Sequence, residues 1–253
     1  MSTDIISEAC KELHVSIYST VPDVGCRACG GCCVTPHMTM IEFCASMNFL
    51  QDKPGLFQET ISRLVPSHGS FPGQLMCRFQ LPDQLCSIHP SRPLACRLHG
   101  HPVLKAMHNQ YDVHCDTTKP AADLTPDDVY GLLDRINVIN ARFYPHYQTP
   151  YWICGLTAEA WLSIVVTDMQ QPAFRLLKQI ISRACNLKDV SDVFCQTVPI
   201  KEKVTLIDAF HALSTSEHVQ AIGLLEEIRD GFPETGAYYY FEADEYLRHI
   251  KKK

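Results

Sequence analysis

The chain has 253 residues, of which 46% are hydrophobic, so it can bury a core in one large domain or two small ones. Its formal net charge of −6 argues against a nucleic-acid partner, because proteins that bind nucleic acids usually present a basic face. The first residues lack the basic start and apolar run of a signal peptide, and no stretch approaches about 18 consecutive apolar residues, so we expect neither export nor a membrane span.

Cysteine is unusually frequent, with thirteen in the chain. Since no signal peptide is recognised, we expect a cytoplasmic protein whose thiols stay reduced and available to metal ions. A disulfide framework, or a set of inert thiols, is the alternative interpretation.

Residues 20–120 hold nine of the thirteen cysteines and ten of the sixteen prolines. Proline removes an amide donor and clashes inside a helix, so this stretch cannot form long helices. The pattern predicts turns and loops with two short helices, at 37–49 and 55–64.

From Thr125 onward the pattern becomes helical. Thr125 is a predicted N-cap, followed by a first-turn proline, two acidic residues and apolar residues at helical spacing. Further helices are expected from Thr157, from Pro172, over 204–213, over 216–229 and over 235–250. The predicted fold is mainly α, with an irregular cysteine-rich metal-binding half (residues 1–120) packed on an α-helical bundle (residues 121–253).

The stretch CRACGGCC, residues 26–33, has four cysteines in eight residues and is the first candidate for a metal site. Cys26 and Cys29, separated by two residues, form a chelate whose sulfurs can reach one metal ion, and the two glycines that follow let the backbone pass close to it. Cys32 and Cys33 are adjacent, and adjacent side chains of extended backbone point to opposite sides. They therefore serve two metal ions, or two irons of one cluster, in a predicted polynuclear site.

Four cysteines cannot fill two tetrahedral sites, so we expect further ligands from the same half of the chain. The predicted metal ligands are Cys26, Cys29, Cys32, Cys33, Cys77, Cys86, Cys96 and Cys115. Eight thiolates suit two Cys₄ sites, and they suit an iron–sulfur cluster, iron or zinc; the spacing does not choose between these metals.

CRACGGCC, Cys77, the stretch CSIHPSRPLACR (residues 86–97) and Cys115 together resemble the CxxCxxCC cysteine-cluster (YkgJ-like) family. This resemblance covers about residues 20–120 and implies a zinc- or iron-chelating protein, often one with an iron–sulfur cluster. The family includes members similar to flagellin lysine N-methylases, so the resemblance allows an enzyme without assigning one. Arg78-Phe79, His89 and Leu98-His99-Gly100 depart from the usual family pattern.

Other residues have weaker signals. Four histidines could complete a mixed Cys/His site, although we expect each to lie at the surface or satisfied in the core: His99, His101, His108 and His114. Arg92 and Arg97 are expected to hydrogen-bond backbone carbonyls or offset thiolate charge, rather than bind an anionic substrate. Five isolated cysteines are expected to be small buried residues: Cys10, Cys44, Cys154, Cys185 and Cys195. Tyr238, Tyr239 and Tyr240 are expected to pack against the helices, and the basic end (Lys251 to Lys253) to be a solvated tail.

No nucleophile elbow, P-loop, zinc-protease motif or dinucleotide fingerprint occurs in the sequence, and we identify no catalytic residue. Three hypotheses remain. The chain is an iron-binding metalloprotein with a redox or protein-modification role, a structural zinc module that recruits a protein or peptide partner, or a methyltransferase-like enzyme that modifies proteins.

Overall fold

The structure of the chain is a computed structural model. It describes residues 3–26, 36, 38–64, 77–83, 85–103 and 124–143, and in the second half residues 158, 161, 162, 165, 177–179, 181, 182, 222–224 and 226. The elements of this described part are helices, which confirms the mainly α fold, and an isolated β-bridge joins Gln80 to Cys86.

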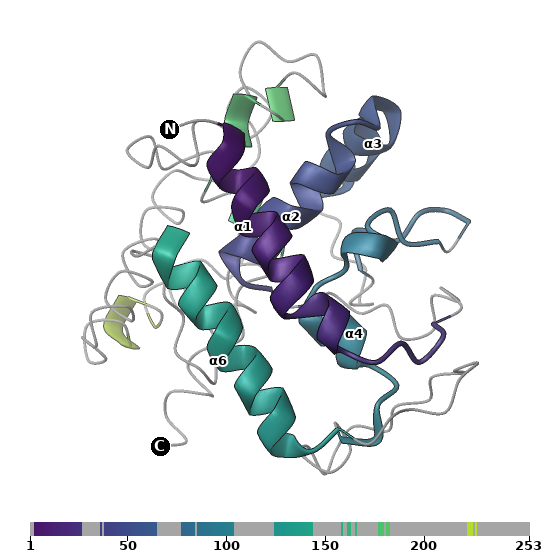
Figure 1. The fold of residues 1–253 in the computed structure, drawn as a ribbon. Coiled ribbons are helices and arrows are strands. Elements are labelled where there is room, and N and C mark those ends of the chain that lie inside the picture. Colours follow the sequence, from purple (N-terminus) through teal and green to yellow (C-terminus); the bar gives the residue numbers. More distant parts are fainter. Residues whose placement is uncertain are drawn as a thin grey trace.

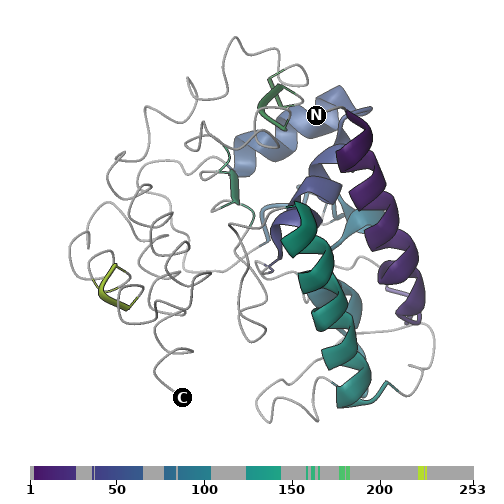
Figure 2. The same ribbon diagram turned by 60° about the vertical axis from the view of Figure 1, so that its left-hand side comes forward.

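Three helices form the frame of the described part: α1 (Thr3–Ser16), α2 (Met40–Leu50) and α6 (Pro126–Phe143). Each of them contacts the other two, and Figures 1 and 2 show α1 and α6 lying side by side. Helix α3 (Pro54–Leu64) follows α2 and packs on it. Two short elements, η2 (His89–Ser91) and α4 (Leu94–Leu98), lie in the cysteine-rich stretch, and a further turn, η1 (Tyr18–Thr20), follows α1.

One hydrophobic cluster joins these helices. It contains fully buried side chains from each of them, such as Leu13 of α1, Phe43 of α2 and Phe57 of α3, together with Ile136 of α6. Removing apolar surface of this kind from water stabilises a fold by about 25 cal/mol per Å². The frame is therefore held by ordinary hydrophobic burial.

The sequence predicts the starts of two helices closely. Thr39 caps α2 in a capping box with Glu42, so the expected helix 37–49 begins a little later, at Met40. Thr125 caps α6: the amide of Asp128 donates to Thr125 Oγ1 at 3.2 Å, and the Asp128 carboxylate accepts from the Thr125 amide and hydroxyl. These hydrogen bonds hold the pKa of Asp128 below its usual range. The expected helix 55–64 is α3, whereas α1 was not expected.

The described positions of the second half agree with the predicted helices. Ala158, Trp161, Leu162 and Val165 are helical and buried, as are Leu177 and Ile181, and all six belong to the same hydrophobic cluster. Residues 222–224 and 226 are helical too. The expected helices 204–213 and 235–250, with Tyr238 to Tyr240, lie outside the described residues, and the division at residue 120 stays a prediction. No helix in the described ranges has the length and apolar character needed to span a membrane.

Candidate metal centre

Four of the eight predicted ligands lie in the described part of the chain: Cys26, Cys77, Cys86 and Cys96. None of these four forms a disulfide. Cys77 is buried and the other three are half-buried. The other predicted ligands, Cys29, Cys32, Cys33 and Cys115, lie outside the described residues, so the complete ligand set stays a prediction.

A tight turn brings Cys77 and Cys86 to neighbouring positions. The amide of Gln80 donates to the carbonyl of Cys77 at 3.0 Å, and Leu81 and Ser87 donate to Leu85 and Phe79 at 2.7 and 2.8 Å. Gln80 then pairs with Cys86 in the isolated antiparallel bridge. Phe79, 1% exposed, fixes this hairpin in the hydrophobic cluster.

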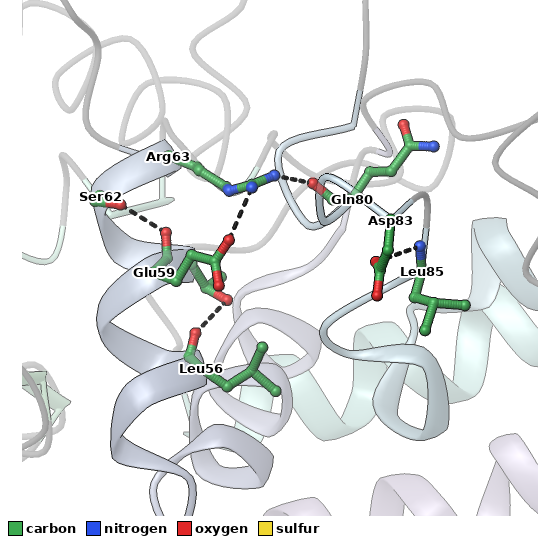
Figure 3. Close-up of polar contacts among 8 residues, drawn as sticks. Leu56, Glu59, Ser62, Arg63, Gln80, Asp83 and Leu85 are labelled. Carbon is green, nitrogen blue, oxygen red and sulfur yellow. Dashed lines mark hydrogen bonds and ion pairs between the residues drawn. The ribbon is translucent and has the colours of Figure 1, made fainter.

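A side chain of helix α3 also holds this hairpin in position. Figure 3 shows the Arg63 guanidinium reaching from α3 to the carbonyl of Gln80, to which Nη1 donates, while Nη2 contacts Glu59 Oε1 at 2.9 Å. The side chain of Asp83 closes the turn by accepting the amide of Leu85 at 3.1 Å. The backbone beside Cys77 and Cys86 is thus fixed by a helix and by its own turn.

The chain from Cys86 to Cys96 consists of short hydrogen-bonded turns. His89 donates its amide to the carbonyl of Cys86 at 3.2 Å, and Cys96 donates to the carbonyl of Pro93 at 3.0 Å, in the first turn of α4. Proline at position 93 suits the start of a helix, because it fixes φ and needs no amide partner there. Cys96 therefore stands on a short helix whose position depends on its neighbours.

Cys26 follows a bend in the backbone at Gly25. Gly25 adopts a φ of 67°, a left-handed conformation that costs glycine little, and its amide donates to Asp23 Oδ1 at 2.9 Å. Val24, 2% exposed, anchors this bend in the protein.

The thiols are close enough to act on one another. Burial is the main cause that raises the pKa of Cys96, and the neighbouring Cys77 and Cys86 raise it further. Burial also raises the pKa of Cys86, with a smaller contribution from Cys26. Among the described residues, no group of three His, Cys, Asp or Glu side chains has the geometry of a metal site. The four described cysteines gather in one region without forming a finished site by themselves.

Two arginines hold the loop that carries these cysteines. Arg97 donates through Nε to the carbonyl of Arg92 at 2.9 Å and through Nη2 to the carbonyl of Pro90 at 2.6 Å. Arg92 donates to the carbonyl of His89 at 3.0 Å. The expectation that both bind backbone carbonyls is confirmed. Arg97 also lies over the ring of Tyr18, with its Cζ 4.0 Å from the ring centroid.

A buried carboxylate, which the sequence analysis missed, links this loop to the frame. Glu42, 3% exposed, accepts the amide of Leu94 at 2.7 Å, the amide and hydroxyl of Thr39 at 2.9 and 3.0 Å, and the hydroxyl of Tyr18 at 3.4 Å. Burial raises the pKa of Glu42, and these donors oppose the rise. The sequence signal was the capping-box spacing Thr39-x-x-Glu42, which identifies a helix start but not the contact with Leu94.

Three buried polar atoms without a hydrogen-bond partner lie on the segment that carries three of the described cysteines. In the described ranges, the buried side-chain atoms without a hydrogen-bond partner are Gln80 Oε1, Ser87 Oγ, Arg92 Nε and His101 Nδ1. Gln80, Ser87 and Arg92 all lie on the segment that carries Cys77, Cys86 and Cys96. Ser87 Oγ and Arg92 Nε are donors, and donors beside metal-bound sulfur stabilise its charge.

The isolated cysteines and the candidate histidines lie partly inside and partly outside the described residues. Cys44 is fully buried, as expected; Cys10 is half-buried, and burial raises its pKa to about 12. His99 is half-buried and His101 is 1% exposed, with Nε2 3.0 Å from the carbonyl oxygen of Pro22. The rest lie outside the described residues: His108, His114, Cys154, Cys185 and Cys195.

Comparison with known proteins supports the same stretch. No curated protein and no solved structure matches the chain. Residues 25–116 match the model of the CxxCxxCC family, described as "Putative zinc- or iron-chelating domain". The match contains all eight predicted cysteine ligands. Residues 25–116 of this chain are therefore similar to the CxxCxxCC family of zinc- or iron-chelating domains.

Proposed function

We propose that this chain is a cytoplasmic metalloprotein whose eight-cysteine cluster binds iron, as an iron–sulfur or other polynuclear centre, or zinc. One observation carries the proposal: segments that lie far apart in the sequence bring Cys26, Cys77, Cys86 and Cys96 into one region, where each thiol acts electrostatically on a neighbour. Clustered thiols become clustered negative charges when they ionise, and a bound cation offsets that repulsion. The match to a chelating domain supports the same conclusion.

The donor set also limits the chemistry. A metal ion with four thiolate ligands has no open position for water or substrate, so such a site suits electron transfer or structural support better than hydrolysis. An iron centre here supplies redox chemistry, and a protein or peptide is then the substrate or electron-transfer partner we propose.

A structural zinc module is the second candidate. The compact hydrogen-bonded turns around Cys77, Cys86 and Cys96 favour it, because closed thiolate sites commonly hold such turns in place. In that case the metal stabilises a surface that binds a partner protein.

The first test is the metal and acid-labile sulfide content of the full chain, purified without oxygen, with its absorbance spectrum. Two or more irons per chain with sulfide and broad visible absorption support an iron–sulfur centre. Colourless protein with about two zinc ions per chain supports the zinc module. Protein that holds neither metal, even after reconstitution, contradicts both.

The ligand assignment is tested by Cys96→Ser, with Cys44→Ala as its matched control. Cys96 belongs to the predicted ligand set, whereas Cys44 is a buried core thiol on α2. We expect Cys96→Ser to lower the metal content per folded chain and Cys44→Ala to leave it unchanged, by elemental analysis of purified protein. Equal metal content in the two variants would rule out Cys96 as a ligand.

A further inference from the structure

Two noncovalent contacts join the turn that follows α1 to α4 and the residues just beyond it. The first is made by Arg97 of α4, whose Cζ lies 4.0 Å from the ring centroid of Tyr18. The second is made by the ring of His101, whose Nε2 lies 3.0 Å from the carbonyl oxygen of Pro22, 79 positions earlier in the chain. Both contacts therefore connect the same two segments, which lie far apart in the sequence.

Both contacts include a buried ring. Tyr18 is 4% exposed and His101 is 1% exposed. A carbonyl oxygen only accepts hydrogen bonds, so His101 Nε2 donates to Pro22. Hydrogen bonds and cation–π contacts are stronger where water does not compete for the same groups. The amide of His101 also donates to the carbonyl of Leu98 at 3.0 Å, which fixes its backbone relative to α4.

The hydroxyl of Tyr18 reaches α4 by a second route. It donates to Glu42 Oε1 at 3.4 Å, and the same oxygen accepts the amide of Leu94, the first residue of α4, at 2.7 Å. Tyr18 is thus connected to the start of this short helix through Glu42, and to its last turn through the stacked Arg97.

Each of the joined segments carries a predicted ligand. From Pro22 the chain bends at Gly25, where φ is 67°, and reaches Cys26. On the other segment, Cys96 precedes the stacked arginine of α4. A single contact between two segments leaves them free to rotate about it, whereas two contacts at separate points fix both their separation and their relative direction.

We propose that Tyr18, Arg97 and His101, with the Pro22 carbonyl, form a clasp that holds Cys26 in place relative to Cys96. The inference rests on the metal-binding function proposed above and adds to it three positioning residues that bind no metal. The contacts of the clasp are made between protein groups, so they restrict the freedom that the ligands would otherwise lose on binding an ion. A chelating site releases its ion when its ligands separate, so the clasp slows metal release.

The test measures two rates on the full chain loaded with zinc(II): zinc release to an excess of chelator, and amide hydrogen exchange of residues 18–26. His101→Phe keeps a buried ring and removes the donor to Pro22, whereas His101→Gln keeps an N–H that can make that hydrogen bond. Tyr18→Leu removes the ring face beside Arg97, whereas Tyr18→Phe keeps it. Tyr130→Leu is the matched control, because Tyr130 is an exposed aromatic residue of α6.

We expect His101→Phe and Tyr18→Leu each to speed both rates by about three- to tenfold, the effect of losing one buried contact. His101→Gln, Tyr18→Phe and the control should stay within about twofold of the wild type. Because both contacts hold the same two segments, the double variant His101→Phe with Tyr18→Leu should have an effect smaller than the product of the two single effects.

Three results overturn the proposal while leaving metal binding intact. They are zinc release that is unchanged in His101→Phe and Tyr18→Leu, effects that multiply in the double variant, and exchange that speeds equally in α3, which indicates a general loss of stability. A wild-type chain that binds no zinc and holds no iron overturns the function proposed above as well.

Discussion

At the scale of single residues, Glu42 is the link between the cysteine loop and the helical frame. Its carboxylate accepts hydrogen bonds from Tyr18 of η1, from the cap of α2 and from the start of α4, which lies 52 positions from Glu42. Buried carboxylates are stable only when donors surround them, as they do here. We therefore regard Glu42 as a positioning residue for Cys96, two residues beyond its contact at Leu94.

Replacing Glu42 by Ala should destabilise the protein by about 3 kcal/mol, because it leaves the buried Leu94 and Thr39 amides without their acceptor. Glu42→Gln keeps an acceptor and should cost less. Burial raises the pKa of Glu42 above its ordinary value of 4.5, so the folded state binds this proton more tightly than the unfolded state. Stability should then fall as the pH rises from about 4.5 through the folded-state pKa.

Urea unfolding of the wild type and of Glu42→Gln across this pH range measures that effect. The wild type should lose stability with rising pH relative to the glutamine variant, which cannot ionise at this position. Parallel pH profiles for the two proteins would show that the carboxylate does not change its protonation on folding.

At the scale of secondary-structure elements, α3 supports the hairpin that carries Cys77 and Cys86. Arg63 makes two contacts of different kinds, one to the half-buried carbonyl of Gln80 and one to the exposed side chain of Glu59 (Figure 3). An exposed i,i+4 ion pair contributes little, about 0.5 kcal/mol at most, whereas a hydrogen bond from a charged group to a half-buried carbonyl contributes more.

Arg63→Met should therefore lower the free energy of unfolding by about 1 kcal/mol and speed metal loss to a chelator, because it frees the Gln80 carbonyl. The matched variant Glu59→Gln breaks only the ion pair and should change both quantities little. Chemical denaturation and the rate of chelator-induced metal release measure the two effects. Equal effects of the two variants would show that the hairpin does not depend on the Gln80 contact.

The sequence predicted these elements unevenly, for physical reasons. Helix α6 and its cap follow from Thr125 and the apolar spacing behind it, and the eight cysteines follow from their own chemistry. Glu42, Arg63 and His101 make contacts with residues 17 to 79 positions away, and local patterns do not encode such contacts. Helix α1 was missed although the buried residues Ala9 and Leu13 of the helix, and Ile17 just after it, recur every fourth residue.

At the scale of the whole molecule, buried hydrogen bonds link the second half of the chain to the cysteine-rich half. The indole of Trp161 donates to the carbonyl of Met38 at 2.6 Å, and both groups are buried. Asn140 of α6 adds a second link by accepting the amide of Ile41 at 3.1 Å. These bonds fix the chain just before α2, five residues after Cys33 in the sequence.

Trp161→Phe keeps an aromatic ring in the core and removes the donor, so the Met38 carbonyl is left buried without it. The free energy of unfolding should fall by about 1–3 kcal/mol. Circular dichroism during urea unfolding measures the change, with Tyr130→Phe as a control, because Tyr130 is an exposed aromatic residue of α6. A Trp161→Phe variant as stable as the control would contradict the link.

The hydrophobic cluster also bears on whether the chain folds before or after it binds metal. Many small metal-binding domains have no core of their own, and they collapse only when the ion arrives. Here Leu13, Phe43, Phe57 and Ile136 already form a core, and Glu42 sets α4 beside it. We therefore expect the helices to form before the metal binds, and a chain that has lost its metal to take it up again without complete refolding.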